Sequence, residues 1–444
     1  MRIGLQTSIA NAIALGTAGA EQDGELDLAR IPWEGGPDYY TVAQNGTKMT
    51  SAEASGWNED TFFPIAVFLT HPNRAADLLD LGINTMMALD AGGGGGGTPA
   101  DGAAAGIFML PQWGEWTTGE VNAAGNFAVG WFVNDEPEML PNQPDDQFLR
   151  LADQQADVAA ARAINDGRFM FTNFGNGVLR TFWSPDTMDE YVQDVDACCV
   201  DKYPYTSPQV RFEYGRTPDW TAVTGLTNDT QPNRDASQAS AAYGWQLDQM
   251  RTFDNPSSRR PIWFFVETKM PFLGESGADI ILYDEIEGAV WSGIAHEARG
   301  ISYFQQNGFY PGGLPVNDPN TGSAHCGSVF SLFDCEVGLQ TRITQINSRI
   351  TELAPVLNTQ SYVFDFGAVN IDTMLKAKDG FAYIFASVGV VPTLGSKTFT
   401  LTGSGITGTS VEVLYESRTL TVTGGQFTDT FAQEYTHHIY KVAI

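Results

Sequence analysis

The sequence is poor in cationic residues. It contains 24 Lys and Arg against 53 Asp and Glu, which gives a formal net charge of −29. A field of this sign repels phosphate backbones and anionic lipid headgroups, so nucleic acid and membrane surfaces are not expected as partners. A neutral polysaccharide is compatible with an acidic surface, but so is simple solubility, and the charge therefore selects no partner.

Long apolar runs are lacking as well. No stretch approaches the roughly 20 apolar residues that a bilayer span requires, so we expect no membrane insertion. The would-be apolar part of the N-terminus is interrupted by Gln6, Thr7, Ser8 and Asn11, which disfavours a cleaved signal peptide. Localisation stays open, with a cytoplasmic or virion-associated protein favoured over a classically secreted one.

Four cysteines are too few for a disulfide scaffold. Cys198 and Cys199 are consecutive in a strand-like run, so we expect two buried thiols on opposite faces of a sheet. Cys326 and Cys335 flank a step in a Gly/Ser-rich loop. A local disulfide and two free thiols are both open for that pair.

Three common catalytic or cofactor motifs are missing. The five histidines show no HExxH or similar ligand spacing, so no catalytic metal is expected. There is no G-x-S-x-G elbow of a serine hydrolase. The glycine run at 92–97 satisfies G-x-G-x-x-G, but no clear helix opens directly after it and no acidic residue ends a suitable next strand. We therefore expect no dinucleotide and no other cofactor.

Aromatic residues, in contrast, are plentiful. They make up 12% of the chain, with ten Trp and 27 Phe, enough for a large core and for platforms on which sugars stack. A chain of 444 residues exceeds one ordinary core and fits a barrel of about 250 to 300 residues with a smaller module. We expect an N-terminal arm at 1–60, a barrel at 61–360 and a β-sandwich at 361–444.

Eight short apolar runs alternate with helical or turn-rich stretches, the pattern of parallel strands joined by crossover helices. The runs are Phe62–Leu69, Ile83–Leu89, Ile107–Gln112, Ala128–Asn134, Arg168–Asn173, Val195–Asp201, Pro261–Glu267 and Gly300–Gln305. Helices are expected at 73–81, 145–165, 236–253, 280–296 and 340–357. This alternation predicts a (β/α)8 TIM barrel of the α/β class. Beyond residue 361, short alternating runs rich in Thr, Val and Phe predict a small antiparallel β-sandwich.

Two glutamates follow apolar strands at the barrel end where active sites lie. Glu136 follows the fourth run and Glu267 ends the seventh, on opposite sides of the pore. Burial tunes such carboxylates for acid-base work, and a facing pair is the constellation of glycoside hydrolysis. The alternative is that Asp135, Glu136 and Glu138 merely favour a helix N-terminus, and that Glu267 is a solvated strand end.

The segment Asn134-Asp135-Glu136-Pro137 resembles the Asn-Glu-Pro signature of the large clan of retaining (β/α)8 glycosidases that includes β-galactosidases and cellulases. Further segments look like bacterial and phage-borne members with a trailing β-sandwich; these are Ala75–Leu89, Gly288–Trp291, Gly300–Phe304 and His438–Val442. The resemblance implies that Glu136 is the general acid/base and Glu267 the nucleophile. Asp135 stands where the clan's usual Asn binds the sugar 2-hydroxyl, and Gln305 follows Phe304 where the clan has an aromatic residue.

Six other residues are expected to bind the glycan, because each follows a strand with a polar or stacking side chain. They are His71, Gln112, Trp113, Asn173, Asp201 and Tyr203. The expected function is a retaining glycoside hydrolase acting on a neutral or weakly charged poly- or oligosaccharide. The alternative is a non-catalytic glycan-binding or structural protein, such as a phage tail component, with a homo-oligomer or virion assembly left open. Carboxyl groups about 5 to 5.5 Å apart in an open cleft would favour retaining hydrolysis.

Overall fold

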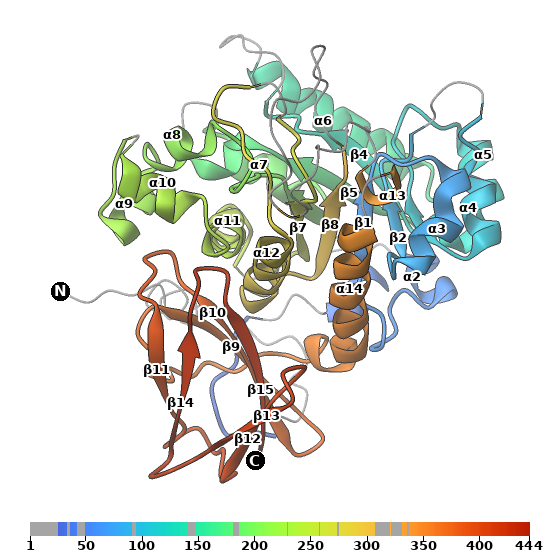
Figure 1. Cartoon of the computed structure of the whole chain (residues 1–444). Helices are drawn as coiled ribbons and strands as arrows, with labels where there is room; N and C mark the ends of the chain where they lie inside the picture. The colour runs from blue at the N-terminus through green and yellow to red at the C-terminus, as the bar shows by residue number, and fades with distance from the viewer. Residues whose placement is uncertain are drawn as a thin grey trace.

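The computed structural model describes residues 25–32, 36–41, 49–90, 95–139, 147–180, 186–228, 230–256, 258–272, 275–306, 320, 331–334 and 337–444. Over these residues the chain forms a barrel of eight parallel strands followed by an antiparallel β module (Figure 1). The fold class predicted from the sequence is therefore confirmed.

Each of the eight predicted apolar runs coincides with one barrel strand, and only β4 and β5 extend beyond their runs, by one residue each. The strands are β1 (Ile65–Phe68), β2 (Thr85–Met87), β3 (Phe108–Leu110), β4 (Gly130–Asp135), β5 (Phe169–Phe174), β6 (Ala197–Val200), β7 (Ile262–Glu267) and β8 (Gly300–Phe304). Their order is β3-β2-β1-β8-β7-β6-β5-β4. Parallel bridges from Met109 to Ala128 and from Gln112 to Phe132 join β3 to β4 and close the barrel.

Helices surround the strands, as Figure 1 shows. They are η3 (Pro72–Arg74), α3 (Ala75–Asp80), α4 (Pro99–Ala105), α5 (Thr118–Ala123), η4 (Gly125–Phe127), α6 (Gln147–Ala163), η6 (Asn176–Leu179), α7 (Met188–Gln193), α8 (Val210–Tyr214), α9 (Pro218–Thr224), α10 (Gln231–Ser237), α11 (Ala241–Arg251), α12 (Tyr283–Ala295), α13 (Ser331–Asp334) and α14 (Val337–Leu357). None of the helices in the described ranges has the length and apolarity of a bilayer span.

One expectation about the glycine run was wrong. Helix α4 does begin shortly after it, at Pro99, with a capping box formed by Thr98 and Asp101. The backbone N–H of Thr98 donates to the Asp101 carboxylate over 2.7 Å. That carboxylate binds a free backbone N–H at the start of the helix, the place where a helix can otherwise bind a phosphate. The presence of this helix therefore does not point to a dinucleotide site.

The interior of the barrel is filled mainly by aromatic rings on inward-facing strand positions. Strand alternation places Trp263 and Phe265 of β7 inside and Phe264 against the outer helices. The N-terminal arm closes the end at which the strands begin. There the Trp263 indole N–H donates to the Tyr40 hydroxyl over 2.9 Å, and Trp57 stacks on Trp263 with 5.9 Å between ring centroids.

The alternation on β6 explains the paired cysteines. Cys198 packs in the layer between strands and helices, while Cys199 lies in the barrel interior, and both are buried free thiols. The prediction of two thiols on opposite faces is confirmed. The other pair, Cys326 and Cys335, lies outside the described residues.

The C-terminal module consists of a five-stranded antiparallel sheet facing a two-stranded one. The strands are β9 (Ile371–Lys378), β10 (Phe381–Val388), β11 (Gly395–Thr400), β12 (Ser410–Val413), β13 (Arg418–Thr421), β14 (Gln426–Phe431) and β15 (His437–Ala443). The order is β13-β12-β15-β10-β9 in one sheet and β11-β14 in the other. The core between them is aromatic: Phe399 stacks on Phe427, and Tyr440 packs edge-on against both rings.

A segment from near the N-terminus belongs to this module. Leu26 is buried in the module core, and Arg30 forms an antiparallel bridge with Tyr362. The backbone N–H of Ile31 donates to the Ser361 carbonyl over 3.1 Å. Described residues of this part of the chain therefore contact the β module, through Leu26 and Arg30, and the end of the barrel, through Tyr40 and Trp57.

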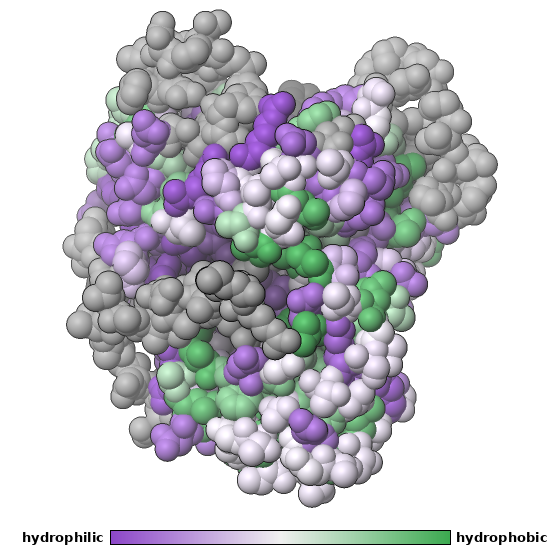
Figure 2. Space-filling model, turned by 90° about the vertical axis from the view of Figure 1, so that its left-hand side faces the viewer, coloured by the Kyte–Doolittle hydropathy of each residue, from purple (hydrophilic) through white to green (hydrophobic). Residues whose placement is uncertain are grey.

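The module packs on the barrel through α12 and α14. Trp291 of α12 stacks on Phe385 of β10 and on His437 of β15, with centroids 6.2 and 5.8 Å apart. Apolar residues of the module, including Phe385 and Ile439, are thereby part of the main core of the barrel. On the face drawn in Figure 2, hydrophilic residues gather over the upper part, the barrel, and the lower part, the module, is paler and greener.

Candidate functional site

At the end of β4, the side chains of Asp135 and Glu136 point in other directions than that of their neighbour Asn134. A register shift between Phe132 and Asn134 marks a bulge, and the Asn134 amide donates outward to Asp157 of α6 over 3.0 Å. Asp135 therefore points inward at the position that a regular strand would give to its neighbour. Glu136 follows with φ of 44°, a left-handed conformation uncommon for a residue with a side chain. Its half-buried side chain leaves the strand end where the chain turns.

Asn173, at the end of β5, joins two of the acidic residues. Its buried side-chain N–H₂ donates to Asp135 and to Asp201, each over 2.9 Å. The backbone carbonyl of Asn173 also accepts the N–H of Glu136 over 2.9 Å. One amide thus fixes the ends of β4, β5 and β6 relative to one another.

The pKa values of Asp135 and Asp201 are raised, because both side chains are buried and have other carboxylates nearby. Burial raises the pKa of Asp135 to about 6; the Asn173 hydrogen bond opposes this rise, and the charge of Glu136 adds a smaller upward contribution. Burial, followed by the charges of Glu136 and Asp135, raises the pKa of Asp201 well above its ordinary value. The protonated form of the Asp201 carboxyl is therefore favoured.

Glu267 lies fully buried at the end of β7 and accepts three hydrogen bonds. Oε1 accepts from the backbone N–H and the hydroxyl of Thr206, both over 3.1 Å, and Oε2 accepts from the Tyr243 hydroxyl over 2.7 Å. Such donors favour the ionised form, as expected for a nucleophile. Burial is the larger effect, however, and raises the pKa of Glu267 to about 7.

Tyr203 lies among the acids of three strands. Its hydroxyl is 3.5 Å from Asp201, and burial raises the pKa of the phenol well above its ordinary value. The charges of Asp201, Glu136, Asp135 and Glu267 raise this pKa further, in that order. Carboxylates from the ends of β4, β6 and β7 therefore all disfavour ionisation of this one buried hydroxyl group.

Three of the residues predicted to bind glycan lie outside this group. Trp113 packs edge-on against Trp131, on the helix side of β4, with 5.2 Å between ring centroids. Gln112 is half-buried and forms a backbone bridge with Phe132. His71 follows β1 and contacts Asp90, with its Nδ1 3.7 Å from the Asp90 carboxylate.

Several residues of the site were not predicted. Thr206 and Tyr243 hold Glu267 but follow no strand directly, so neither stood out in the sequence. Glu138 is buried; its Oε1 accepts the N–H groups of Gly175 and Gly177 over 2.6 and 3.3 Å. Burial and the charge of Glu136 raise the pKa of Glu138 to about 8.

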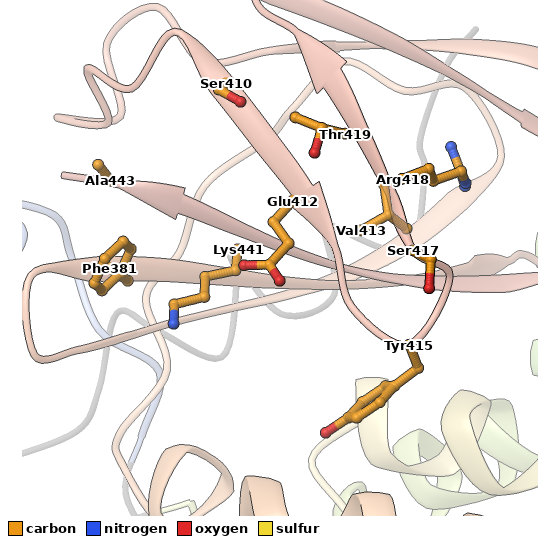
Figure 3. A pocket seen from close by; sticks show the side chains of 10 residues that line it. All are labelled: Phe381, Ser410, Glu412, Val413, Tyr415, Ser417, Arg418, Thr419, Lys441 and Ala443. Atoms are coloured by element: carbon orange, nitrogen blue, oxygen red, sulfur yellow. The ribbon is translucent and has the colours of Figure 1, made fainter.

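Other features of the described residues bear on ligands. No three His, Cys, Asp or Glu side chains in these residues are grouped as a metal site. A hollow of about 540 Å³ lies on the outer face of the β module, lined by Phe381, Glu412, Tyr415 and Lys441 among others. Figure 3 shows Glu412 and Lys441 side by side in it, with Tyr415 extending toward the helices of the barrel.

Comparison with known proteins leaves the chain without an assigned family. The sequence matches no family model and no curated protein. Among solved structures, it resembles one described as a glycoside hydrolase (TM-score 0.47, 10% identity, covering 95% of this chain and 97% of the other). The chain also resembles AmyP in complex with maltose, with a TM-score of 0.45 and 10% identity, over 88% of this chain and 98% of the other. For a GH30 endoxylanase from Clostridium papyrosolvens the TM-score is 0.39 and the identity 11%, over 86% of this chain and 96% of the other. These similarities are too low to assign an activity to this chain.

Proposed function

We propose that this protein is a retaining glycoside hydrolase, with Glu267 as nucleophile and Glu136 as general acid/base. One observation carries the proposal: Glu136 follows β4 and Glu267 ends β7 at the same end of the barrel, with two strands between them and in different environments. Glu267 is fully buried and held by three donors, while Glu136 is half-buried at a strained turn. Retaining glycosidases need two carboxyl groups in such unequal roles.

The roles follow from the surroundings of each glutamate. Fixed donors from Thr206 and Tyr243 orient the Glu267 carboxylate and stabilise its ionised form, which must attack the anomeric carbon. Glu136 acts electrostatically on Asp201, whose pKa is well above its ordinary value, chiefly because of burial. In the proposed mechanism Glu136 delivers a proton to the leaving-group oxygen and recovers one from the incoming water.

The charge of the site favours an uncharged sugar. Asp135, Glu136, Asp201 and Glu267 act together on Tyr203, and the protein carries a net charge of −29. An anionic sugar would be repelled from these carboxylates, whereas the hydroxyls of a neutral sugar donate to them. In this role Asp135, Asn173, Asp201 and Tyr203 bind sugar hydroxyls. Gln112, Trp113 and His71 remain weaker candidates for more distant sugar units.

The test uses Glu267→Ala with Glu275→Ala as a matched control. Glu275 is an exposed glutamate a few residues further along the chain after β7. A panel of chromogenic glycosides identifies a substrate for the wild type. Glu267→Ala should then lose several orders of magnitude in turnover, and added azide should yield a glycosyl azide of inverted configuration. If Glu267→Ala hydrolyses every glycoside as well as Glu275→Ala does, the assignment is wrong.

A second candidate is a glycan-binding protein without turnover. The complete burial of Glu267 and its raised pKa favour it, because a nucleophile must reach the sugar and be ionised. The phage tail component considered from the sequence belongs to this candidate. Binding on a glycan array that is unchanged in Glu267→Ala, with no hydrolysis of the bound glycan by the wild type, would favour it over the hydrolase.

A further inference from the structure

We propose that the β module supplies a positioning residue to the barrel: Glu434 fixes Tyr205 and the first turn of α11, and thereby places Tyr243 against Glu267. The proposal rests on the function proposed for Glu267. It makes the module a part of the catalytic unit.

The loop that carries Glu434 is seated tightly on the barrel. It spans residues 432–436 between β14 and β15. A Cβ atom on Gly288 of α12 would lie 2.6 Å from the Cβ and 2.7 Å from the carbonyl oxygen of Tyr435. Only glycine at position 288 allows the loop to approach α12 this closely. This close contact fixes the position of the loop, and with it that of Glu434, relative to the barrel.

Glu434 makes three hydrogen bonds across the interface. The Tyr205 hydroxyl donates to Oε1 over 2.7 Å, and the backbone N–H of Ser240 donates to Oε2 over 2.8 Å. The Ser240 hydroxyl donates to the backbone carbonyl of Glu434 over 2.9 Å. Ser240 is the N-cap residue of α11, and its side chain makes no capping hydrogen bond within the helix. The carboxylate of Glu434 satisfies the backbone N–H of this N-cap residue and also interacts favourably with the helix dipole.

The same turn of α11 holds the candidate nucleophile. Tyr243 lies three residues after Ser240, and its hydroxyl donates to Glu267 over 2.7 Å. That hydroxyl also accepts the backbone N–H of Tyr205 over 3.4 Å, and the two tyrosine rings lie 5.7 Å apart. The Glu434 carboxylate is therefore bonded to Tyr205, whose backbone N–H contacts the Tyr243 hydroxyl, and to Ser240, which begins the helix that carries Tyr243.

The surroundings of Glu434 are acidic, so its position depends on these donors. Glu285 of α12 lies near, and burial together with the charges of Glu434, Asp279 and Glu267 raises the pKa of Glu285 to about 8. Burial raises the pKa of Glu434 as well, while the bonds from Ser240 and Tyr205 lower it. No cation faces Glu434 in these interactions. Without its donors the carboxylate would turn away from Glu285 toward solvent.

The kinetic test compares Glu434→Ala and Glu434→Gln with Gln433→Ala, an exposed neighbour in the same loop. Glutamine keeps one acceptor and alanine keeps none. With a chromogenic substrate we expect kcat to fall by about 10-fold or more in Glu434→Ala and by less in Glu434→Gln, with KM within about 2-fold of wild type. A role confined to the interface would lower the melting temperature and leave kcat at the value of Gln433→Ala. That result would overturn the proposal.

A second measurement separates this proposal from the proposed hydrolase activity. The urea midpoints of Glu434→Ala, Tyr243→Phe and the double variant give the coupling between the two residues without any substrate. We expect the effect of Tyr243→Phe to be smaller in the Glu434→Ala background, because the turn is already loosened. Additive effects would overturn the positioning. If coupling is found but the wild type hydrolyses no glycoside, the proposed function fails and the structural link stands.

Discussion

Replacing Glu267 by glutamine should stabilise the fold at neutral pH while it abolishes hydrolysis. The buried carboxyl has its pKa raised from 4.5 to about 7 in the folded protein. Above pH 4.5 the unfolded chain releases the proton that the folded protein keeps. Stability therefore falls as pH rises from 4.5 to about 7. A difference of one in pKa between the folded and unfolded states corresponds to about 1.4 kcal/mol, so ionisation of Glu267 lowers the free energy of unfolding by about 3 kcal/mol at pH 8. Glutamine has no charge to bury.

The assay is urea unfolding of wild type and Glu267→Gln at several pH values. The difference in unfolding free energy should be constant below about pH 4.5 and should grow by about 3 kcal/mol in favour of the variant by about pH 8. The difference below about pH 4.5 measures the effect of the exchanged hydrogen bonds, which does not depend on pH. Subtracting it leaves the contribution of the charge on Glu267. Glu59→Gln, at an exposed glutamate, serves as control. A pH-independent difference for Glu267→Gln would refute the reasoning.

Three further outcomes follow from the same contacts. Tyr243→Phe removes a hydrogen bond that lowers the pKa of Glu267, so the rising limb of the pH profile of kcat/KM should move to higher pH; an unchanged limb would contradict this. Glu136→Ala should hydrolyse an activated aryl glycoside nearly as well as wild type but lose activity on a natural glycan, and equal losses on both would argue against its role as acid. Gly288→Ala places a methyl group against Tyr435 and should lower the unfolding free energy by about 1 to 3 kcal/mol, measured in urea, whereas no change would show that the loop can move away.

The barrel could be predicted because each of its strands is buried on both faces. The residues of β7, Ile262 to Glu267, are buried throughout, so they form a continuous apolar run in the sequence. Helix α4 was missed because its glycine- and alanine-rich sequence has no apolar face of helical period, although Thr98 and Asp101 have the spacing of a capping box.

The site could be predicted only in part. Asn173 and Glu267 lie at strand ends and Glu136 and Asp201 follow directly, and the position of the strand ends is a property of the barrel. The donors to Glu267 have no such marker, because Thr206 lies in an insertion and Tyr243 on a helix. The orientation of Trp113 was equally hidden. The ring of Trp113 packs on one of the two sides of β4. A bulge in β4 changes the regular alternation of inward and outward side chains from which that side would be predicted.

The bridge between Arg30 and Tyr362 has a consequence for the order of events during synthesis. Leu26 leaves the ribosome long before its neighbours in the module core, such as Phe366 and Tyr440. The whole barrel is made in between and can fold first, since domains generally fold as units during synthesis. Until then the segment at 25–32 has no sheet to join. A nascent chain arrested after α14 should therefore hold a folded barrel with this segment still sensitive to protease.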